Sequence, residues 1–237
     1  MKINLAKQQA FFDQETHRIK TDFVLNPSSA QIWEYDQLLE PMAEFDLKKI
    51  QIFDMGSGSG RLTFELLRRG FNVTAYDISQ NSLANLAQLY QDQKLPSWGK
   101  LRTTHQLPKA ASADVIVGCD ILHHLPLQEV LAEWKDLLKP TGMAIFSEPN
   151  ALNLLWYGHL WLNKIPWEIE KGILQCYPSN LKLVFLAAGF SACQIYGHGL
   201  IPTPVPLPKM IAARNAKVWA KHQPNLAFRL QIVAKLN

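Results

Sequence analysis

Three glycines at alternate positions follow a short apolar run near residue 50. The loop that contains them consists of Asp54, Met55, Gly56, Ser57, Gly58, Ser59 and Gly60. Glycines let the backbone of a tight strand-to-helix turn approach a ligand closely, and the first N–H groups of the following helix have no partner within that helix. We therefore predict a ligand site at this loop, at the carboxyl end of a strand in a parallel sheet.

The spacing of these glycines separates two classes of ligand. A dinucleotide-binding fingerprint is G-x-G-x-x-G, which would require a glycine at position 61, where this chain has Arg61. The pattern is instead G-x-G-x-G with an acid, Asp54, two residues before it. A dinucleotide-dependent oxidoreductase and a cofactor-binding protein without catalytic activity are the alternatives from other functional classes.

Further polar residues follow the next predicted strands. Asp77 ends the strand predicted at residues 72–77, and an acid at that place can accept hydrogen bonds from both hydroxyls of a ribose. Asp120 follows the apolar strand at 114–119 and precedes the sequence ILHHL. Two turn sequences come later, LKPTGM before the next strand and AGF before the one after it. An ordinary tight turn at the glycines would not require this ordered set.

Together these motifs resemble the class I S-adenosylmethionine-dependent methyltransferases, over about residues 48–197 and the last strand. The resemblance implies S-adenosyl-L-methionine as the cofactor. The glycines would accommodate its methionine part, Asp54 would order the loop and meet the ammonium group, and Asp77 would hold the ribose. The implied cofactor-binding residues are Asp54, Gly56, Ser57, Gly58, Gly60, Asp77, Ile78, His105 and Asp120.

The expected adenine contact departs from the family pattern. Many relatives have an acid after the third strand, where this chain has Thr103-Thr104-His105-Gln106. His105 or Gln106 could supply the hydrogen bond to the adenine amine, and a backbone carbonyl is the alternative.

The catalytic step needs little from the protein beyond alignment, because the sulfonium donor already carries a good leaving group. A base is needed only for an acceptor such as a hydroxyl, and His124 and Glu148 are the catalytic candidates. The histidine aligns with one that is frequent in relatives, although either residue could serve only to order its loop. His123 and His124 do not predict a metal site, because no third ligand follows at a defined spacing.

The acceptor is expected to be a small, largely apolar molecule methylated at oxygen. The motifs of amino-adenine, cytosine and protein-arginine methyltransferases are absent after the strand at 114–119. A lipid, quinone or isoprenoid-linked acceptor at a membrane surface is the alternative. The insert at about 150–177 supplies five aromatic residues, which either line an acceptor pocket or pack as a lid. They are Trp156, Tyr157, Trp161, Trp167 and Tyr177.

Hydrophobic periodicity gives the elements that would position these residues. Strands alternate with amphipathic helices, which predicts an α/β, Rossmann-like doubly wound sheet of seven mostly parallel strands with an antiparallel last strand. Residues 1–47, with a break at Asn26-Pro27, are expected to form a helical N-terminal cap on the domain at 48–237. Apolar residues alternate along the last strand, LAFRLQIVAKL, so one of its faces should be wetter than the other.

Composition limits the class of protein. The chain has 237 residues, 48% hydrophobic and 19% charged, as in a globular domain and unlike a disordered or disulfide-rich protein. The N-terminus lacks the apolar run of a secretory signal, and the most apolar stretch, residues 151–162, is shorter than the roughly 20 residues that span a bilayer. We therefore expect a cytoplasmic protein that does not cross a membrane.

The net charge of +4 conceals an asymmetry along the chain. Residues 1–47 contain four basic and eight acidic side chains, whereas residues 171–237 contain eight basic side chains and no acid. Arg214, Lys217 and Lys221 follow helical spacing in a short basic helix. We expect its charge to be balanced by the acidic N-terminal segment; contact with an anionic membrane surface is the alternative. Nucleic acid is not expected as a partner, and the sequence carries no signal for an oligomeric state.

Overall fold

The computed structural model describes residues 3–15, 24–43, 45–46, 49–200 and 223–236. The basic segment with Arg214, Lys217 and Lys221 lies outside these residues. Among the described residues of the N-terminal segment, helices at Leu5–Glu15 and Ser29–Leu39 lie on either side of the predicted break. Ser28 caps the later one, and its side chain and that of Gln31 each accept a hydrogen bond from the other's backbone N–H. Among the described residues, no helix combines the length and apolarity needed to cross a bilayer.

A seven-stranded sheet in the order β3-β2-β1-β4-β5-β7-β6 forms the centre of the molecule. All pairings between β3 and β5 are parallel, and β7 is antiparallel to both of its neighbours, which confirms the predicted fold. The strand order reverses direction between β1 and β4, and ligands of doubly wound sheets bind at such a point. The strands are β1 (Ile52–Met55), β2 (Val73–Tyr76), β3 (Leu101–Thr104), β4 (Ala113–Cys119), β5 (Leu138–Pro149), β6 (Ala192–His198) and β7 (Arg229–Lys235).

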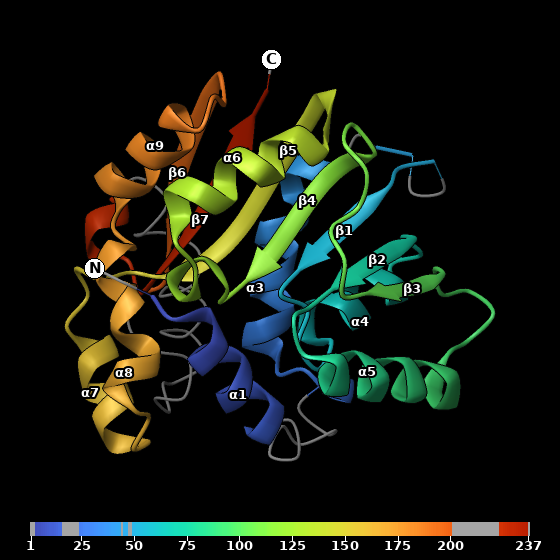
Figure 1. Ribbon diagram of the computed structural model, residues 1–237, viewed down its shortest axis with the longest axis horizontal. Coiled ribbons are helices and arrows are strands. Elements are labelled where there is room, and N and C mark those ends of the chain that lie inside the picture. The colour runs from blue at the N-terminus through green and yellow to red at the C-terminus, as the bar shows by residue number, and fades with distance from the viewer. Residues whose placement is uncertain (1–2, 16–23, 44, 47–48, 201–222, 237) are drawn as a thin grey trace.

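Helices cover both faces of the sheet (Figure 1). The α-helices are α1 (Leu5–Glu15), α3 (Ser29–Leu39), α4 (Arg61–Arg68), α5 (Gln80–Gln93), α6 (Leu127–Leu137), α7 (Leu155–Leu162), α8 (Trp167–Glu170) and α9 (Pro178–Ala187). Short 3-10 helices lie at Glu40–Met42 (η1), Leu122–His124 (η2), Lys171–Gln175 (η3) and Pro224–Leu226 (η4). α6 and α9 pack on one face, while α3 and α4 pack on the other. Figure 1 shows α1 below the ends of β1 and β4, where the parallel strands finish.

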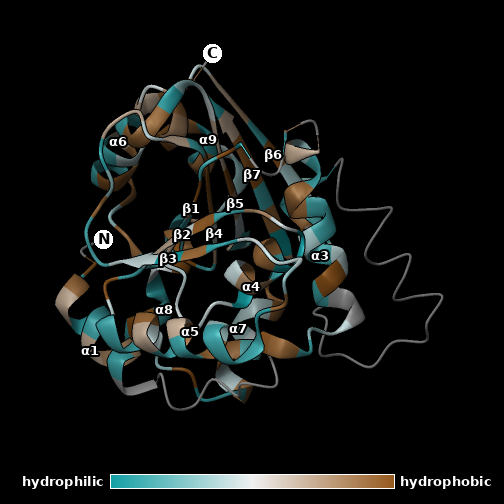
Figure 2. Ribbon diagram, turned by 90° about the vertical axis from the view of Figure 1, so that its right-hand side faces the viewer, coloured by the Kyte–Doolittle hydropathy of each residue, from teal (hydrophilic) through white to brown (hydrophobic). Residues whose placement is uncertain are grey.

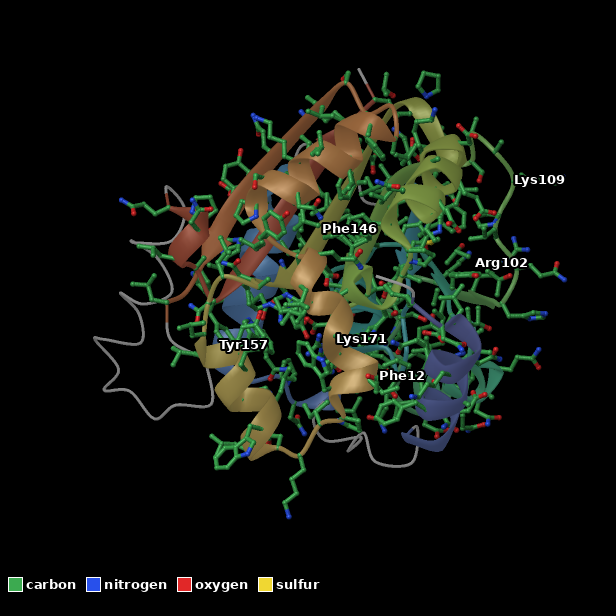
Figure 3. All side chains as sticks on the ribbon, turned by 60° about the vertical axis from the view of Figure 1, so that its left-hand side comes forward. Phe12, Arg102, Lys109, Phe146, Tyr157 and Lys171 are labelled. Carbon is green, nitrogen blue, oxygen red and sulfur yellow. The ribbon has the colours of Figure 1, made fainter. Side chains whose placement is uncertain are left out.

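The apolar core lies between the sheet and these helices. Phe146 on β5 is fully buried, and its ring stacks on that of Trp134 at 5.8 Å between centroids and contacts Phe185 at 6.0 Å. Figure 3 shows Phe146 in the interior, and Figure 2 shows apolar colour along the strands between helices of mixed colour. This packing makes the sheet a rigid base for the loops at its carboxyl edge.

The expectation of a wetter face on β7 is wrong. Residues 230–234 are all buried, because helices cover both faces of the sheet at β7. The polar side chain of Gln231 is satisfied internally: its Nε2 donates to the Gln37 carbonyl at 2.8 Å, and its Oε1 lies 2.9 Å from His198 Nε2. Helix α3 of the N-terminal segment therefore covers the face of β7 that the alternating pattern predicted to be exposed to solvent.

The acidic N-terminal segment is joined to the body of the domain by ion pairs. Glu34 pairs with Arg229 of β7 at 2.6 Å, and Asp36 pairs with Arg69 at 2.7 Å. Arg229 of the C-terminal third thus meets one N-terminal acid, whereas the predicted balance of charge with the basic helix at Arg214, Lys217 and Lys221 lies outside the described residues. The same contacts fix α3 against the sheet.

Candidate active site

The glycine loop joins β1 to α4 in a conformation that favours glycine. Gly56, Gly58 and Gly60 have φ of 71°, 51° and 93°, values that L side chains rarely adopt. A Cβ on Gly56 would lie 2.4 Å from the Cδ1 atom of Ile121, so a side chain there would collide with the loop after β4. The N–H groups of Gly56 and Ser57 donate to the Tyr76 carbonyl at 2.8 and 3.0 Å, which ties the loop to β2.

Asp54 lies beneath this loop and not in the cavity. Its side chain is buried and accepts a hydrogen bond from Thr63 Oγ1 at 2.5 Å. Burial raises the pKa of Asp54 to about 7, although the Thr63 hydrogen bond opposes the rise. This position suits the loop-ordering role that the resemblance implies.

Asp77 lies at the end of β2 with both carboxylate oxygens directed to backbone donors. Oδ2 accepts from the N–H of Gly58 at 2.7 Å and Oδ1 from that of Ser79 at 2.8 Å. A carboxylate offers about four acceptor sites, and the backbone of Ile78 is a third donor, so capacity for one ribose hydroxyl remains. Burial raises the pKa of Asp77 above its ordinary value against these hydrogen bonds.

A cavity of about 280 Å³ opens beside the glycine loop at the carboxyl edge of the sheet. Six of the residues singled out from the sequence line it: Gly56, Gly58, Asp77, Ile78, Asp120 and His124. Five others do not: Asp54, Ser57, Gly60, His105 and Glu148. The lining adds apolar walls from Tyr76, Leu107, Leu125 and Trp134, which suit the flat faces of a nucleobase.

The residues after β3 meet the cavity differently from the expectation. His105 is exposed and does not line the cavity, whereas Leu107, two residues later, does. The adenine contact of His105 therefore stays a prediction. The only sequence feature that could have indicated Leu107 as a cavity residue is its position as an isolated apolar residue in a polar loop, and this is a weak signal.

Helix α1 supplies a wall that the sequence did not indicate. Leu5, Gln8 and Phe12 line the cavity, and Figure 3 shows Phe12 on this helix. The side chain of Asp13 accepts a hydrogen bond from Ser79 Oγ, beside Asp77. The N-terminal helix thus contacts the loop that follows β2. Its amphipathic pattern predicts a helix but not the surface on which it packs.

A partly buried network of charges fixes Asp120. This residue has a left-handed φ of 58°, and its carboxylate pairs with Arg61 and with Arg229, the latter at 2.7 Å. Burial alone would raise the pKa of Asp120, but the two arginines outweigh it and hold the pKa well below the usual range. The carboxylate therefore stays ionised at the wall of the cavity.

Glu148, one of the two catalytic candidates, is completely buried behind the loop after β4. Its Oε1 accepts from the N–H groups of Ile121 and Leu122 at 2.8 and 2.7 Å, and its Oε2 lies 2.6 Å from His123 Nδ1. The His123 Nε2 atom lies 3.2 Å from Glu170 Oε2. Burial disfavours the charge on His123, but these two carboxylates raise its pKa to about 10. Such contacts suit a positioning residue, and direct participation of Glu148 in catalysis stays a prediction.

His124, the other candidate, faces the cavity. Its ring hydrogen-bonds to the backbone of Ile169, and within the described part of the chain its buried Nδ1 atom has no hydrogen-bond partner. The Phe12 ring contacts it edge-on at 5.1 Å. Burial and the charge on His123 lower the pKa of His124 to about 3, so its imidazole is neutral at physiological pH.

The aromatic residues of the insert do not line this cavity. Trp156 stacks on Phe228 at 4.3 Å and donates to the Phe228 carbonyl, and the Tyr157 hydroxyl donates to the Ala151 carbonyl at 2.9 Å. Figure 3 shows Tyr157 well apart from Phe12. The two expected roles were lining an acceptor pocket and packing within the insert. Trp156 and Tyr157 have the second role.

Known proteins resemble this chain in sequence and in fold. Residues 53–144 match the sequence model of a family described as a methyltransferase domain. The ubiquinone biosynthesis O-methyltransferase of Rickettsia typhi is 31% identical over 107 residues, which are 44% of this chain and 43% of that protein. The chain thus matches less than half the length of such curated relatives.

Solved structures share the fold over almost the whole chain. A SAM-dependent methyltransferase of Thermotoga maritima has a TM-score of 0.65, 15% identity, and coverage of 97% of this chain and 100% of that one. The magnesium protoporphyrin IX methyltransferase of Synechocystis PCC 6803, with S-adenosylhomocysteine bound, has a TM-score of 0.61, 18% identity, and coverage of 99% and 100%. Residues 53–144 thus match a methyltransferase domain, and the chain has the fold of solved S-adenosylmethionine-dependent methyltransferases, which supports S-adenosylmethionine as the cofactor.

Proposed function

We propose that this protein transfers a methyl group from S-adenosylmethionine to a hydroxyl oxygen of a small, largely apolar acceptor of the quinone type. The observation that carries the proposal is the convergence of Gly56, Gly58, Asp77 and His124 on one cavity at the switch point of the sheet. The curated relatives named for ubiquinone biosynthesis support oxygen as the methylated atom and a quinone-type acceptor.

The protein's main task in methyl transfer is to hold the acceptor oxygen in line with the methyl group of the cofactor. The glycine loop and Asp77 would hold the cofactor so that its methyl group points at the acceptor, and the apolar lining would exclude water from the reacting atoms. A hydroxyl acceptor loses a proton as it attacks. The His124 ring, whose Nδ1 has no partner within the described residues, is the group at the cavity placed to accept this proton, although burial lowers its pKa to about 3 and makes it a weak base.

A second form of this proposal places the acceptor in a membrane. Helix α7 and the residue before it expose large apolar side chains: Leu154 and Trp161 are each 79% exposed and Leu162 is 72% exposed. Helix α7 contains no charged Lys, Arg, Asp or Glu side chain. Tryptophan and leucine on one exposed helix are typical of contact with the interfacial region of a bilayer, from which a long-chain quinol would be drawn.

Calorimetric titration tests the cofactor site. S-adenosylhomocysteine should bind the wild-type protein, and Asp77→Ala should raise its Kd at least about tenfold, because hydrogen bonds to a charged group contribute about 1.5–3 kcal/mol each. Asp92→Asn, on the exposed surface of α5, is the matched control and should bind as the wild type does. Unchanged affinity in Asp77→Ala would refute its ribose role, and binding of NAD instead would favour the oxidoreductase.

Methyl transfer tests the acceptor. A radiolabelled methyl group should pass from S-adenosylmethionine to a dihydroxybenzoquinol with a short isoprenoid chain, and His124→Ala should lower kcat. Co-sedimentation with anionic vesicles separates the two forms of the proposal. Retention of the protein on vesicles that is lost in Trp161→Ser supports a membrane-held acceptor, and equal recovery in the supernatant with and without vesicles speaks against it.

A further inference from the structure

Two histidines and a glutamate gather beside the cavity, and of the three only His124 lines it. His123, His124 and Glu170 each present one donor atom, and these three atoms lie within 4.8 Å of one another. His123 and Glu170 are already close, with 3.2 Å between Nε2 and Oε2. The histidines follow β4, whereas the glutamate is at the end of α8, in the insert after β5. The sequence therefore gave no spacing that would reveal the cluster.

The cluster is held from outside by contacts that orient each ring. His123 Nδ1 is paired with Glu148 at 2.6 Å, which leaves Nε2 directed at Glu170. The His124 ring is hydrogen-bonded to the backbone of Ile169, so the proton is on that side and Nδ1 carries the lone pair. A carboxylate behind a ligating histidine is the usual outer partner at protein zinc sites.

The two segments that carry the ligands are also locked together. A Cβ on Gly172 would lie 1.6 Å from the His123 carbonyl oxygen, so only glycine lets η3 lie against this loop. Gln175 Nε2 donates to the carbonyls of Leu122 and Leu125 at 3.3 and 3.0 Å. These contacts fix the insert against the loop after β4 independently of any ion.

We infer that His123 Nε2, His124 Nδ1 and a Glu170 carboxylate oxygen form a binding site for one divalent transition-metal ion of the zinc type. Two imidazole nitrogens and one carboxylate are a ligand set that zinc takes at sites with an open fourth position. The buried, unpartnered Nδ1 of His124 is the independent sign of a ligand, because a lone pair removed from water without a partner is costly.

Little movement is needed to close the site. Zinc–nitrogen bonds of about 2.0–2.1 Å place the donor atoms of a tetrahedral site about 3.3 Å apart. The pair formed by His123 and Glu170 already meets this distance, and all three donor atoms lie within 4.8 Å of one another. His123 gives up its Nε2 proton to solvent when the ion binds and keeps the Nδ1 proton on Glu148.

The site deepens the proposed function, on which this consequence rests. His124 lines the cavity, so an ion held by it lies next to the place proposed for the acceptor. A hydroxyl that binds there passes its proton to bulk water more readily before methyl transfer, because the ion stabilises the resulting oxyanion. A metal-bound Nδ1 is no longer a base, so the ion replaces His124 in that role and also orients the acceptor oxygen.

The test measures metal binding on the full chain, freed of any histidine tag and treated with a chelator. Calorimetric titration with Zn²⁺ should show one ion per chain, and Co²⁺ should give the strong visible absorption of a nitrogen- and oxygen-ligated tetrahedral site. Glu170→Gln should weaken Zn²⁺ binding by about tenfold or more, as expected for loss of a ligand charge. Glu168→Gln is the matched control on the same helix; its exposed side chain should leave the affinity within twofold.

Two outcomes overturn the inference. One is no saturable Zn²⁺ binding by the wild-type chain, a result that does not depend on whether a variant folds. The other is equal affinity in Glu170→Gln, His124→Ala and the wild type, with each variant still binding S-adenosylhomocysteine. Failure of the proposed function is separate: a chain that binds zinc at these residues but transfers no methyl group to a quinol keeps the metal site and loses the acceptor.

Discussion

Asp54 offers a sharp test of how the glycine loop is supported, because one substitution should raise stability and lower cofactor affinity. The side chain is buried below the loop, and burial raises its pKa from 3.8 to about 7. Asp54→Asn keeps the shape and an oxygen that can still accept from Thr63. It removes only the charge, which the loop is expected to use for the ammonium group of the cofactor.

The expected size follows from linkage. A folded-state pKa about 3 units above the unfolded value lowers stability by about 4 kcal/mol once the carboxyl is ionised. Because the carboxyl pKa is higher in the folded state, the protein loses stability as the pH rises. The loss begins near the unfolded pKa, at about pH 4, and is complete once the pH has passed the folded pKa of about 7. The wild type has already lost about 1.7 kcal/mol of its free energy of unfolding at pH 5 and loses about 2.5 kcal/mol more by pH 8. Asp54→Asn has no such loss, so its stability relative to the wild type should rise by about 2.5 kcal/mol between these pH values.

Urea unfolding followed by tryptophan fluorescence at the two pH values gives this difference directly. The exposed Asp92→Asn is the control, and its stability should stay within about 0.5 kcal/mol of the wild type at both. Titration with S-adenosylhomocysteine should show weaker binding in Asp54→Asn than in either protein. If the difference in stability between Asp54→Asn and the wild type is the same at pH 5 and pH 8, the buried charge of Asp54 is not what destabilises the wild type.

Three other substitutions test the parts around the site. Gly56→Ala should cost more than about 1 kcal/mol in urea unfolding and weaken cofactor binding, because a Cβ there meets Ile121 at a positive φ, whereas Gly158→Ala, with nothing within 4 Å, should not destabilise. Phe146→Ala should lose about 3–5 kcal/mol by the same assay, and a loss below 1 kcal/mol would show that the core can collapse around it. Arg229→Met should lose about 1.5–3 kcal/mol, since Glu34 and Asp120 lose one charged partner but keep Ser147 Oγ and Arg61, and a neutral result would mean that water reaches them.

The sequence alone determined the order of the elements and the chemistry of the loop. Glycines at positions 56, 58 and 60, the acid at 77 and the alternation of strands with amphipathic helices are local signals, so they needed no knowledge of distant contacts. Each of these three glycines has a positive φ in the structure, and Asp77 faces the cavity. Local sequence patterns are informative where residues close in the chain determine the backbone conformation.

The tertiary structure decided everything that depends on residues far apart in the chain. It placed α1 over the cavity and buried the polar face of β7 under α3. It also enclosed Glu148 behind His123 and brought Glu170 to the two histidines. None of these follows from periodicity, because a helix or strand pattern says which face is apolar but not which segment covers it. Charge and metal-binding capacity at this site arise from burial and from distances between segments, which only the folded chain defines.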